Sequence, residues 1–311
     1  MKGISLHSII PVRTEPRESA EQSTQILFGE TFEITNRAMP DQSQIGLCPT
    51  NNRWRYVRLD SDGQEGWVDA KMVTPMSEKE YSAYSKAYQT AAYVAFPMTY
   101  AVSENNGQTI PLTAGTRLTN YQSPITNSAE RDQSPIKAAY GRFEVLGVGF
   151  RVEAGMIIEK PFEMNEQNLQ QAVRFYLNTP YLWGGKNALG MDCSGFTQTI
   201  MSLFGKRLLR NASEQATQGR AIKDIKNARA GDLVFFNHND GRISHVGIIL
   251  APLTPNLSPL APSPLAFTIV HCSGRVKVEK LDKTGIYTTE KIDIKCPNGH
   301  YTHHLVSIRR V

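Results

Sequence analysis

One cysteine in this chain stands where a thiol could act as a nucleophile. Cys193 closes the run PYLWGGKNALGMDC, and an apolar pattern with helical spacing begins directly after it at Phe196. The start of a helix offers unpaired backbone N–H groups and the positive end of the helix dipole, and both favour the thiolate form of cysteine. A thiolate attacks carbonyl carbons, so Cys193 is the candidate nucleophile of a cysteine hydrolase.

Two strand-like apolar runs downstream each carry a histidine. His245 lies in ISHVGIIL and His271 lies in FTIVHC. A hairpin register that sets His271 beside His245 would place Cys193 and both imidazoles in line, with Gly247 leaving room on the same face. His245 would then take the thiol proton and return it to the departing amine, while His271 fixes its tautomer. The backbone N–H of Cys193 and the hydroxyl of Tyr181 are the candidate oxyanion donors.

A metal site is the main alternative interpretation of the Cys and His side chains near the C-terminus. Cys296, His300, His303 and His304 lie close together in the sequence. Their spacing matches no paired zinc scheme, and the PNG sequence between them favours a turn. We therefore expect a solvated loop in this region, with no metal and no cofactor.

Composition indicates an ordinary globular protein. The 311 residues are 40% hydrophobic, and the net charge of +5 comes from basic residues that are scattered rather than gathered into a stripe that follows nucleic acid. No run approaches the ~18 apolar residues of a membrane helix, and the first residues are too polar for a signal peptide. We expect a cytoplasmic monomer, or a periplasmic or secreted one if a signal peptide is removed. Cys48 and Cys272 are expected to be small buried hydrophobic residues.

The candidate catalytic residues have to be positioned by a domain of α+β class. Apolar residues at helical spacing begin after Asn165, which could cap that helix, and a second helix begins at Cys193. Four strand-like runs follow, at residues 232–236, 243–250, 267–272 and 304–309, and predict helices packed on an antiparallel sheet. Five prolines within residues 251–265 predict an extended surface loop between the two histidine strands.

Two small all-β barrels are expected ahead of this domain. Short apolar segments separated by polar turns fill the first ~75 residues and recur from Ala91 onward. Between them, Ser77 and Glu80 form a capping-box pattern that begins a linker helix. The expected domains are a first barrel (1–76), the linker helix (77–92), a second barrel (93–160) and the α+β domain (161–311).

Several motifs of the last domain resemble the NlpC-type family of papain-like cysteine peptidases, which hydrolyse peptides of the bacterial cell wall. The motifs occur in the family's order across roughly residues 165 to 311: PYLWGG, DCSG, NASEQ, AGDLVFF, SHVG and IVHCS. The resemblance implies that Cys193 is the nucleophile, His245 the base, His271 the third polar residue and Tyr181 the tyrosine of the site. The proline-rich insertion is a departure, because family members usually join the histidine strands by a short turn.

The barrels resemble bacterial Src-homology-3-like modules, and the whole arrangement resembles the γ-D-glutamyl-L-diamino acid endopeptidases, also called dipeptidyl-peptidase VI. This implies hydrolysis of murein tripeptide or tetrapeptide with a free N-terminal L-Ala, releasing L-Ala-γ-D-Glu during cell-wall peptide recycling. A buried ammonium needs a carboxylate and hydrogen-bond acceptors, for which Glu65 and Tyr100 are nominated. Asp192, Ser194 and Ser213 are implied to contact the substrate's backbone and carboxylate, although Asp192 could instead cap the helix.

Two other functions share these features. The same cysteine–histidine layout serves acyltransferases and lipid hydrolases related to lecithin-retinol acyltransferase, but no amphipathic membrane helix supports that reading. A cell-wall-binding scaffold with an idle peptidase domain would also carry two barrels. Intact Cys193, His245 and His271 argue against it.

Overall fold

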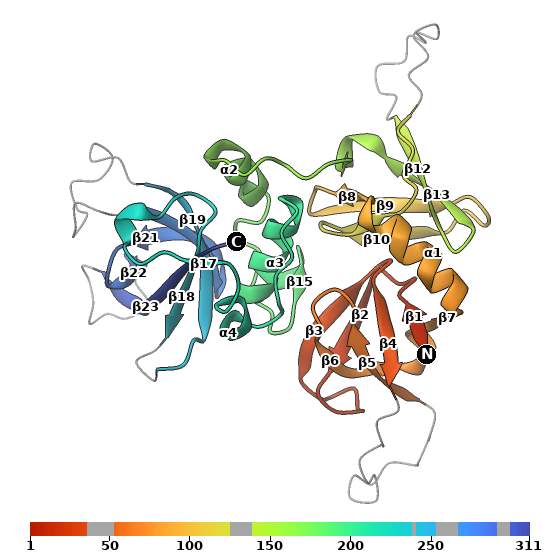
Figure 1. The fold of residues 1–311 in the computed structure, drawn as a ribbon, viewed down its shortest axis with the longest axis horizontal. Helices are drawn as coiled ribbons and strands as arrows, with labels where there is room; N and C mark the ends of the chain where they lie inside the picture. The colour runs from red at the N-terminus through yellow and green to blue at the C-terminus, as the bar shows by residue number, and fades with distance from the viewer. Residues whose placement is uncertain (36–52, 125–138, 238–240, 253–266, 291–298) are drawn as a thin grey trace, which may run out of the picture. The chain divides into compact units, whose positions relative to one another are not determined.

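The chain forms two structural units. A computed structural model describes residues 1–35, 53–124, 139–237, 241–252, 267–290 and 299–311. Within it, the chain divides into Met1–Pro161 and Phe162–Val311, drawn in red to light green and in green to blue in Figure 1. The first unit is almost entirely β, and the second carries helices on an antiparallel sheet, as expected for an α+β domain.

The first barrel is a seven-stranded antiparallel sheet in the order β3-β2-β6-β5-β4-β1-β7. Alternating residues of its strands are buried, as in the pattern of β2 and β4, and they close a core around Ile10, Phe32 and Val57. The strands are β1 (Lys2–Ile4), β2 (Ile9–Arg13), β3 (Gln22–Leu27), β4 (Thr31–Thr35), β5 (Trp54–Leu59), β6 (Glu65–Asp69) and β7 (Thr74–Met76).

Helix α1 (Glu78–Gln89) begins with the expected capping box, in which the Ser77 hydroxyl accepts from the Glu80 N–H and Glu80 accepts from the Ser77 N–H. The strands that follow form two small sheets, β10-β9-β13-β12 and β11-β8-β14. Their core is shared with the first barrel, because Phe28 packs edge-on against Phe143 and Phe150. The strands are β8 (Ala92–Val94), β9 (Met98–Ser103), β10 (Thr109–Thr113), β11 (Arg117–Leu118), β12 (Tyr140–Val145), β13 (Val148–Glu153) and β14 (Ile157–Ile158).

The second unit is built on the sheet β17-β23-β18-β19-β20-β21-β22, in which β22 also pairs with β23 and so closes a six-stranded ring. The α-helices of this unit, within the described residues, are α2 (Glu166–Arg174), α3 (Cys193–Leu203) and α4 (Ala212–Gln215). Its strands are β15 (Lys186–Asn187), β16 (Gly190–Met191), β17 (Arg220–Ala221), β18 (Leu233–Asn237), β19 (His245–Pro252), β20 (Phe267–Ser273), β21 (Arg275–Leu281), β22 (Gly285–Thr288) and β23 (His300–Arg310).

Most elements expected in this unit are confirmed, and one expectation is wrong. Asn165 caps α2, and α3 begins at Cys193. The expected loop at residues 300–303 is instead the start of β23, which was expected to begin at His304, and His303 is buried there. Strands β21 and β22 were not anticipated. Cys48, Cys296 and most of the proline-rich segment lie outside the described residues.

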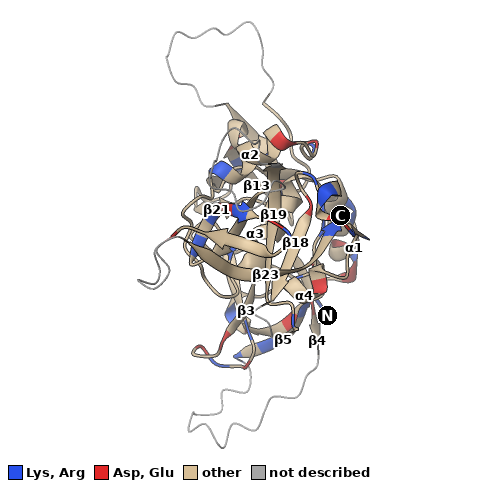
Figure 2. Cartoon of the chain, turned by 90° about the vertical axis from the view of Figure 1, so that its left-hand side faces the viewer, with Lys and Arg blue, Asp and Glu red and all other residues tan. Residues whose placement is uncertain are grey.

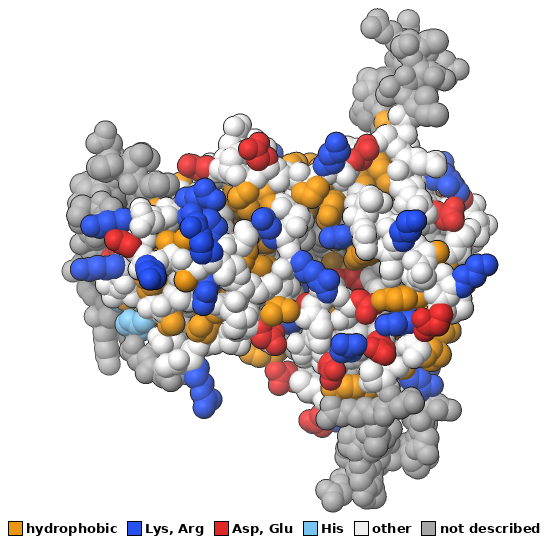
Figure 3. Space-filling model, viewed as in Figure 1, with side chains coloured by type: hydrophobic (Ala, Val, Ile, Leu, Met, Phe, Trp, Pro, Cys, Tyr) orange, Lys and Arg blue, Asp and Glu red, His pale blue; other side chains and the backbone are white. Residues whose placement is uncertain are grey.

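Charged residues of both signs are distributed over the described elements (Figure 2). On the face shown in Figure 3, hydrophobic side chains lie singly or in small groups between polar ones. Among the described residues, no helix is both long and apolar enough to cross a membrane.

Candidate active site

The cysteine lies at the first turn of α3. Asp192 is the N-cap, and its carboxylate accepts the Gly195 N–H at 2.7 Å. The Cys193 side chain is buried, and the backbone N–H of Val246, the residue after His245, hydrogen-bonds to it. Since α3 packs on β19, this bond sets the thiol beside the strand that carries His245.

The ionisation of the thiol differs from the expectation. Burial, together with the adjacent Asp192 carboxylate, raises the pKa of Cys193 to about 11. The Val246 and Ser194 N–H groups and Arg210 lower it, but by less. The expected resting thiolate is therefore corrected to a neutral thiol, because desolvation of the charged form outweighs the helix start. A base has to remove the proton as substrate is attacked.

The two predicted histidines meet, although not as direct cross-strand partners. Gly247 is the residue opposite His271, so His245 is its diagonal neighbour on the same face of the sheet. Nε2 of His245 lies 2.8 Å from Nδ1 of His271. A Cβ on Gly247 would lie 3.0 Å from the His271 Cβ. The absence of a side chain at Gly247 therefore lets the two rings approach.

A carboxylate that the sequence did not suggest stands behind His271. Nε2 of His271 lies 2.8 Å from Oε2 of Glu279, on the neighbouring strand β21. Burial raises the pKa of Glu279. The hydrogen bonds from His271 and Thr288 and the positive charge of Lys277 outweigh burial and lower this pKa to about 2. Burial lowers the pKa of His271, against the opposing effect of Glu279. The pair at neutral pH is therefore a carboxylate and a neutral imidazole.

A third histidine lies against the first two. The His303 ring on β23 stacks on the His245 ring, with centroids 4.2 Å apart and planes 28° from parallel. Phe236 contacts both rings. His303, which was considered only as a metal ligand or loop residue, thus packs directly against the ring of the predicted base, His245.

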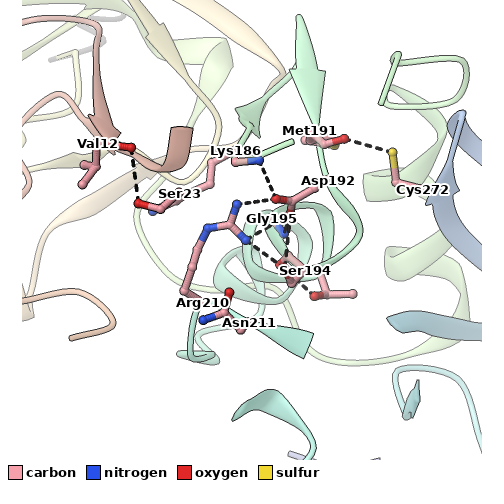
Figure 4. Close-up of polar contacts among 12 residues, drawn as sticks. Val12, Ser23, Lys186, Met191, Asp192, Ser194, Gly195, Arg210, Asn211 and Cys272 are labelled. Atoms are coloured by element: carbon pink, nitrogen blue, oxygen red, sulfur yellow. Dashed lines mark hydrogen bonds and ion pairs between the residues drawn. The ribbon is translucent and has the colours of Figure 1, made fainter. Parts of the chain in front are cut away.

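A buried ion pair fixes the start of α3 (Figure 4). Arg210, 1% exposed, donates to both carboxylate oxygens of Asp192, at 3.0 and 2.5 Å, and to the Ser194 hydroxyl at 2.8 Å. The Gly184 N–H also donates to Asp192, at 2.8 Å. Asp192 therefore acts as helix cap and ion-pair partner. Nothing in the local sequence of Arg210 marked it as fully buried.

The glycines of the WGG and DCSG motifs permit close backbone approach at the same place. A Cβ on Gly195 would lie 2.1 Å from the Gly185 carbonyl oxygen, and one on Gly185 would lie 2.4 Å from that of Gly190. Any larger residue would push the loop away from α3. The motif spacing thus serves to press the loop against the helix that bears the thiol.

Tyr181, the candidate oxyanion donor, lies on this loop. Its N–H donates to the Gly274 carbonyl at 2.9 Å, and it bridges to Met191. Burial, followed by the charges of Cys193 and Asp192, raises the pKa of its hydroxyl. The hydroxyl therefore keeps its proton at neutral pH and can donate a hydrogen bond. Its role toward the oxyanion stays a prediction.

The residues nominated for substrate binding are placed as follows. Ser194 is buried between Asp192 and Arg210, and Ser213 is exposed on α4. Glu65, at the start of β6, is exposed and accepts the Tyr56 hydroxyl at 3.1 Å. Tyr100 on β9 is also exposed. Glu65 and Tyr100 belong to the first unit, and contact of any of these residues with substrate stays a prediction.

The arrangement defines a class of protein. A thiol at a helix start, a histidine base on the adjoining strand and a second histidine that orients it are the parts of a papain-like cysteine peptidase. Among the described residues, no group of three or more His, Cys, Asp or Glu side chains is arranged to hold a metal ion.

Comparison with known proteins identifies the family. Residues 178–306 match the NlpC/P60 family, and residues 12–72 match the bacterial dipeptidyl-peptidase Sh3 domain. The chain is 39% identical over 272 residues to the gamma-D-glutamyl-L-lysine dipeptidyl-peptidase of Bacillus subtilis (strain 168), covering 78% of this chain and 86% of that protein. The chain belongs to the NlpC/P60 family and is a cysteine peptidase.

Two further relatives are similar over most of their length. The dipeptidyl-peptidase 6 of Lysinibacillus sphaericus is 27% identical over 240 residues, which cover 76% of this chain and 82% of that protein. The crystal structure of an NlpC/P60 family protein from Bacillus cereus ATCC 10987 superposes with a TM-score of 0.67 at 16% identity, covering 100% of this chain and 99% of that one. The latter shows a shared fold.

Proposed function

We propose that this enzyme hydrolyses the γ-D-glutamyl-L-diamino acid bond of murein-derived peptides with a free N-terminal L-Ala, releasing L-Ala-γ-D-Glu. The observation that carries the proposal is the 39% identity to a gamma-D-glutamyl-L-lysine dipeptidyl-peptidase over 86% of that protein. The match of residues 12–72 to a dipeptidyl-peptidase Sh3 domain supports the same specificity. The acyltransferase and idle-scaffold readings are not favoured by these relatives.

The reaction proceeds in two steps on this site. His245 accepts the Cys193 proton as the sulfur attacks the γ-carbonyl carbon of D-Glu, and the oxyanion forms within reach of the helix N–H groups. The C–N bond then breaks, and the amine of the diamino acid leaves with the proton from His245. Water, deprotonated by His245, cleaves the thioester to release L-Ala-γ-D-Glu and restore the thiol.

Mass spectrometry of purified enzyme with defined peptides tests the specificity. We expect release of L-Ala-γ-D-Glu from L-Ala-γ-D-Glu-L-Lys and from the corresponding diaminopimelate peptide, with the ratio of rates giving the preferred diamino acid. The same peptides with an acetylated N-terminus should be cleaved at least ~100-fold more slowly, because the ammonium is lost. Equal cleavage of free and acetylated peptides would overturn the dipeptidyl-peptidase specificity while leaving the peptidase activity intact.

Cys193→Ala and Glu65→Gln separate catalysis from recognition. Cys193→Ala should abolish turnover of every peptide, since no nucleophile remains. Glu65→Gln should raise KM for the free peptide and leave the rate on the acetylated peptide unchanged. Tyr100→Phe should act in the same direction with a smaller effect.

We further propose that the enzyme is a cytoplasmic monomer that acts on recycled wall peptides. Cys193 and Cys272 are both free thiols, which suits a reducing compartment. A requirement for a free N-terminal L-Ala would restrict the enzyme to peptides already detached from the glycan. Cell fractionation and size-exclusion chromatography with light scattering test location and oligomeric state.

A further inference from the structure

The carboxylate behind His271 is the clearest feature of the site that its assigned chemistry leaves unused. On strand β21, Lys277 lies opposite His271, and Glu279 lies opposite Ile269. Cross-strand partners point to the same face, so Glu279 is the diagonal neighbour of His271. Its side chain is 7% exposed, and its Oε2 is 2.8 Å from His271 Nε2.

The contact between Glu279 and His271 determines which ring nitrogens of His271 and His245 carry a proton. An ionised carboxylate only accepts hydrogen bonds, so the nitrogen facing Glu279, Nε2 of His271, has to carry the proton. Nδ1 of the neutral His271 is then an acceptor, and it lies 2.8 Å from Nε2 of His245. That nitrogen of His245 in turn has to be the donor. The proton on His245 is thus fixed at Nε2, and Nδ1 is the unprotonated nitrogen.

We propose that Glu279 is a positioning residue of the catalytic site: it sets the tautomers of His271 and His245, and it stabilises the imidazolium that forms on His245. The base that removes the Cys193 proton is then Nδ1 of His245. When that proton arrives, His245 becomes a cation, and Glu279 supplies the balancing negative charge through His271. The proposal concerns thiol activation and holds whichever peptide bond is cleaved.

The surroundings of Glu279 hold it in the ionised form. Thr288 hydrogen-bonds to it, and Lys277 Nζ lies 3.4 Å from Oε1. Lys277 also pairs with Glu290 at 3.0 Å, so one ammonium is shared by two carboxylates. His303, stacked on His245 from β23, is a further titratable group that faces the base. Glu279 is the carboxylate in direct contact with His271 among these groups.

The tautomers can be measured in the unmodified protein. In the full chain labelled with ¹⁵N-histidine, near neutral pH, the ring ¹⁵N shifts of His271 and His245 should both report the Nε2–H form. Assignment uses His271→Gln and His245→Gln. An Nδ1–H form at His271 would overturn the proposal, because that ring could not then donate to Glu279.

The charge is tested with two matched substitutions. Glu279→Gln keeps the shape and an acceptor oxygen but removes the charge, so the apparent pKa of the base should fall. We expect the acid limb of kcat/KM to move to lower pH by about one unit, and kcat to drop about 10- to 100-fold with KM nearly unchanged. Glu290→Gln removes a charge from the same network without contact to His271 and should leave both quantities within about threefold.

The outcomes separate a positioning role from a structural one. If Glu279→Gln matched Glu290→Gln in its pH profile and kcat, the proposal would be wrong. Glu279→Asp, which retains the charge on a shorter side chain, should keep the acid limb closer to wild type than Glu279→Gln does. Failure of the enzyme to cleave γ-D-glutamyl peptides would not affect the tautomer test, because the ring ¹⁵N shifts of His271 and His245 are recorded without substrate.

Discussion

The imidazole of His303 stacks on that of His245 at a centroid distance of 4.2 Å, with the ring planes 28° apart, so the ring of the base is held between a stacked histidine on one side and the hydrogen bond to His271 at its edge. Stacking restricts rotation of the His245 ring about its own axis. This keeps Nε2 of His245 bonded to Nδ1 of His271.

His303 should therefore matter for the position of the base rather than for its protonation. His303→Phe retains a stacked ring and should keep kcat within about threefold of wild type. His303→Ala removes it and should lower kcat about 3- to 10-fold, corresponding to the ~0.5–1.5 kcal/mol of an aromatic pair. Steady-state kinetics on one peptide measures both. An alanine variant as active as wild type would show that stacking is not needed.

The raised pKa of Cys193 predicts how the resting thiol reacts. With a pKa of about 11, only about one thiol in ten thousand is ionised at pH 7. The rate of iodoacetamide alkylation should therefore rise about tenfold per pH unit from neutral to alkaline pH. Peptide mass spectrometry follows the label at Cys193, with Cys272 as internal reference. A rate that is already maximal at mildly acidic pH would instead indicate a resting thiolate.

Loss of Arg210 should destabilise the second unit strongly. Arg210→Met leaves the Asp192 carboxylate buried without its guanidinium partner, and we expect the free energy of unfolding to fall by about 3–5 kcal/mol. Arg275→Met removes a half-exposed partner of Glu290 and should cost about 1 kcal/mol or less. Hydrogen exchange of amides in β18–β20 under urea measures the unfolding of this unit. Equal effects in both variants would contradict the burial argument.

Gly247→Ala tests the approach of the two histidines. The new methyl would lie 2.8 Å from Ile269 Cδ1 and 3.0 Å from His271 Cβ, so the end of the Ile269 side chain has to shift and His271 has to yield by a few tenths of an ångström. We expect a loss of about 1–3 kcal/mol in stability and a fall in kcat larger than any rise in KM. Gly155→Ala, where a Cβ meets no atom within 4 Å, is the control and should change neither. Unchanged kcat in Gly247→Ala would mean that the histidine pair tolerates displacement.

The sequence by itself determined the helix start at Cys193 and the strands that carry His245 and His271, because short-range patterns encode both. The apolar spacing after Cys193 and the capping residue before it suffice to begin a helix there, because capping and helical periodicity depend only on neighbours within one or two turns. Alternating apolar residues likewise placed His245 and His271 on strands. The family motifs then assigned a role to each.

The rest depended on which segments pair across long stretches of chain, and no local pattern specifies that pairing. The alternation in β21 would place Val278 inside, yet Val278 is 42% exposed while the Glu279 side chain is 7% exposed. The polar face turns inward because it finds His271, Thr288 and Lys277 there, and a buried charge is tolerated only where such partners meet it. His303 and Arg210 also reach the site through contacts between segments that are distant in the sequence. Only the closed sheet and the packing of α3 on it brought these partners together.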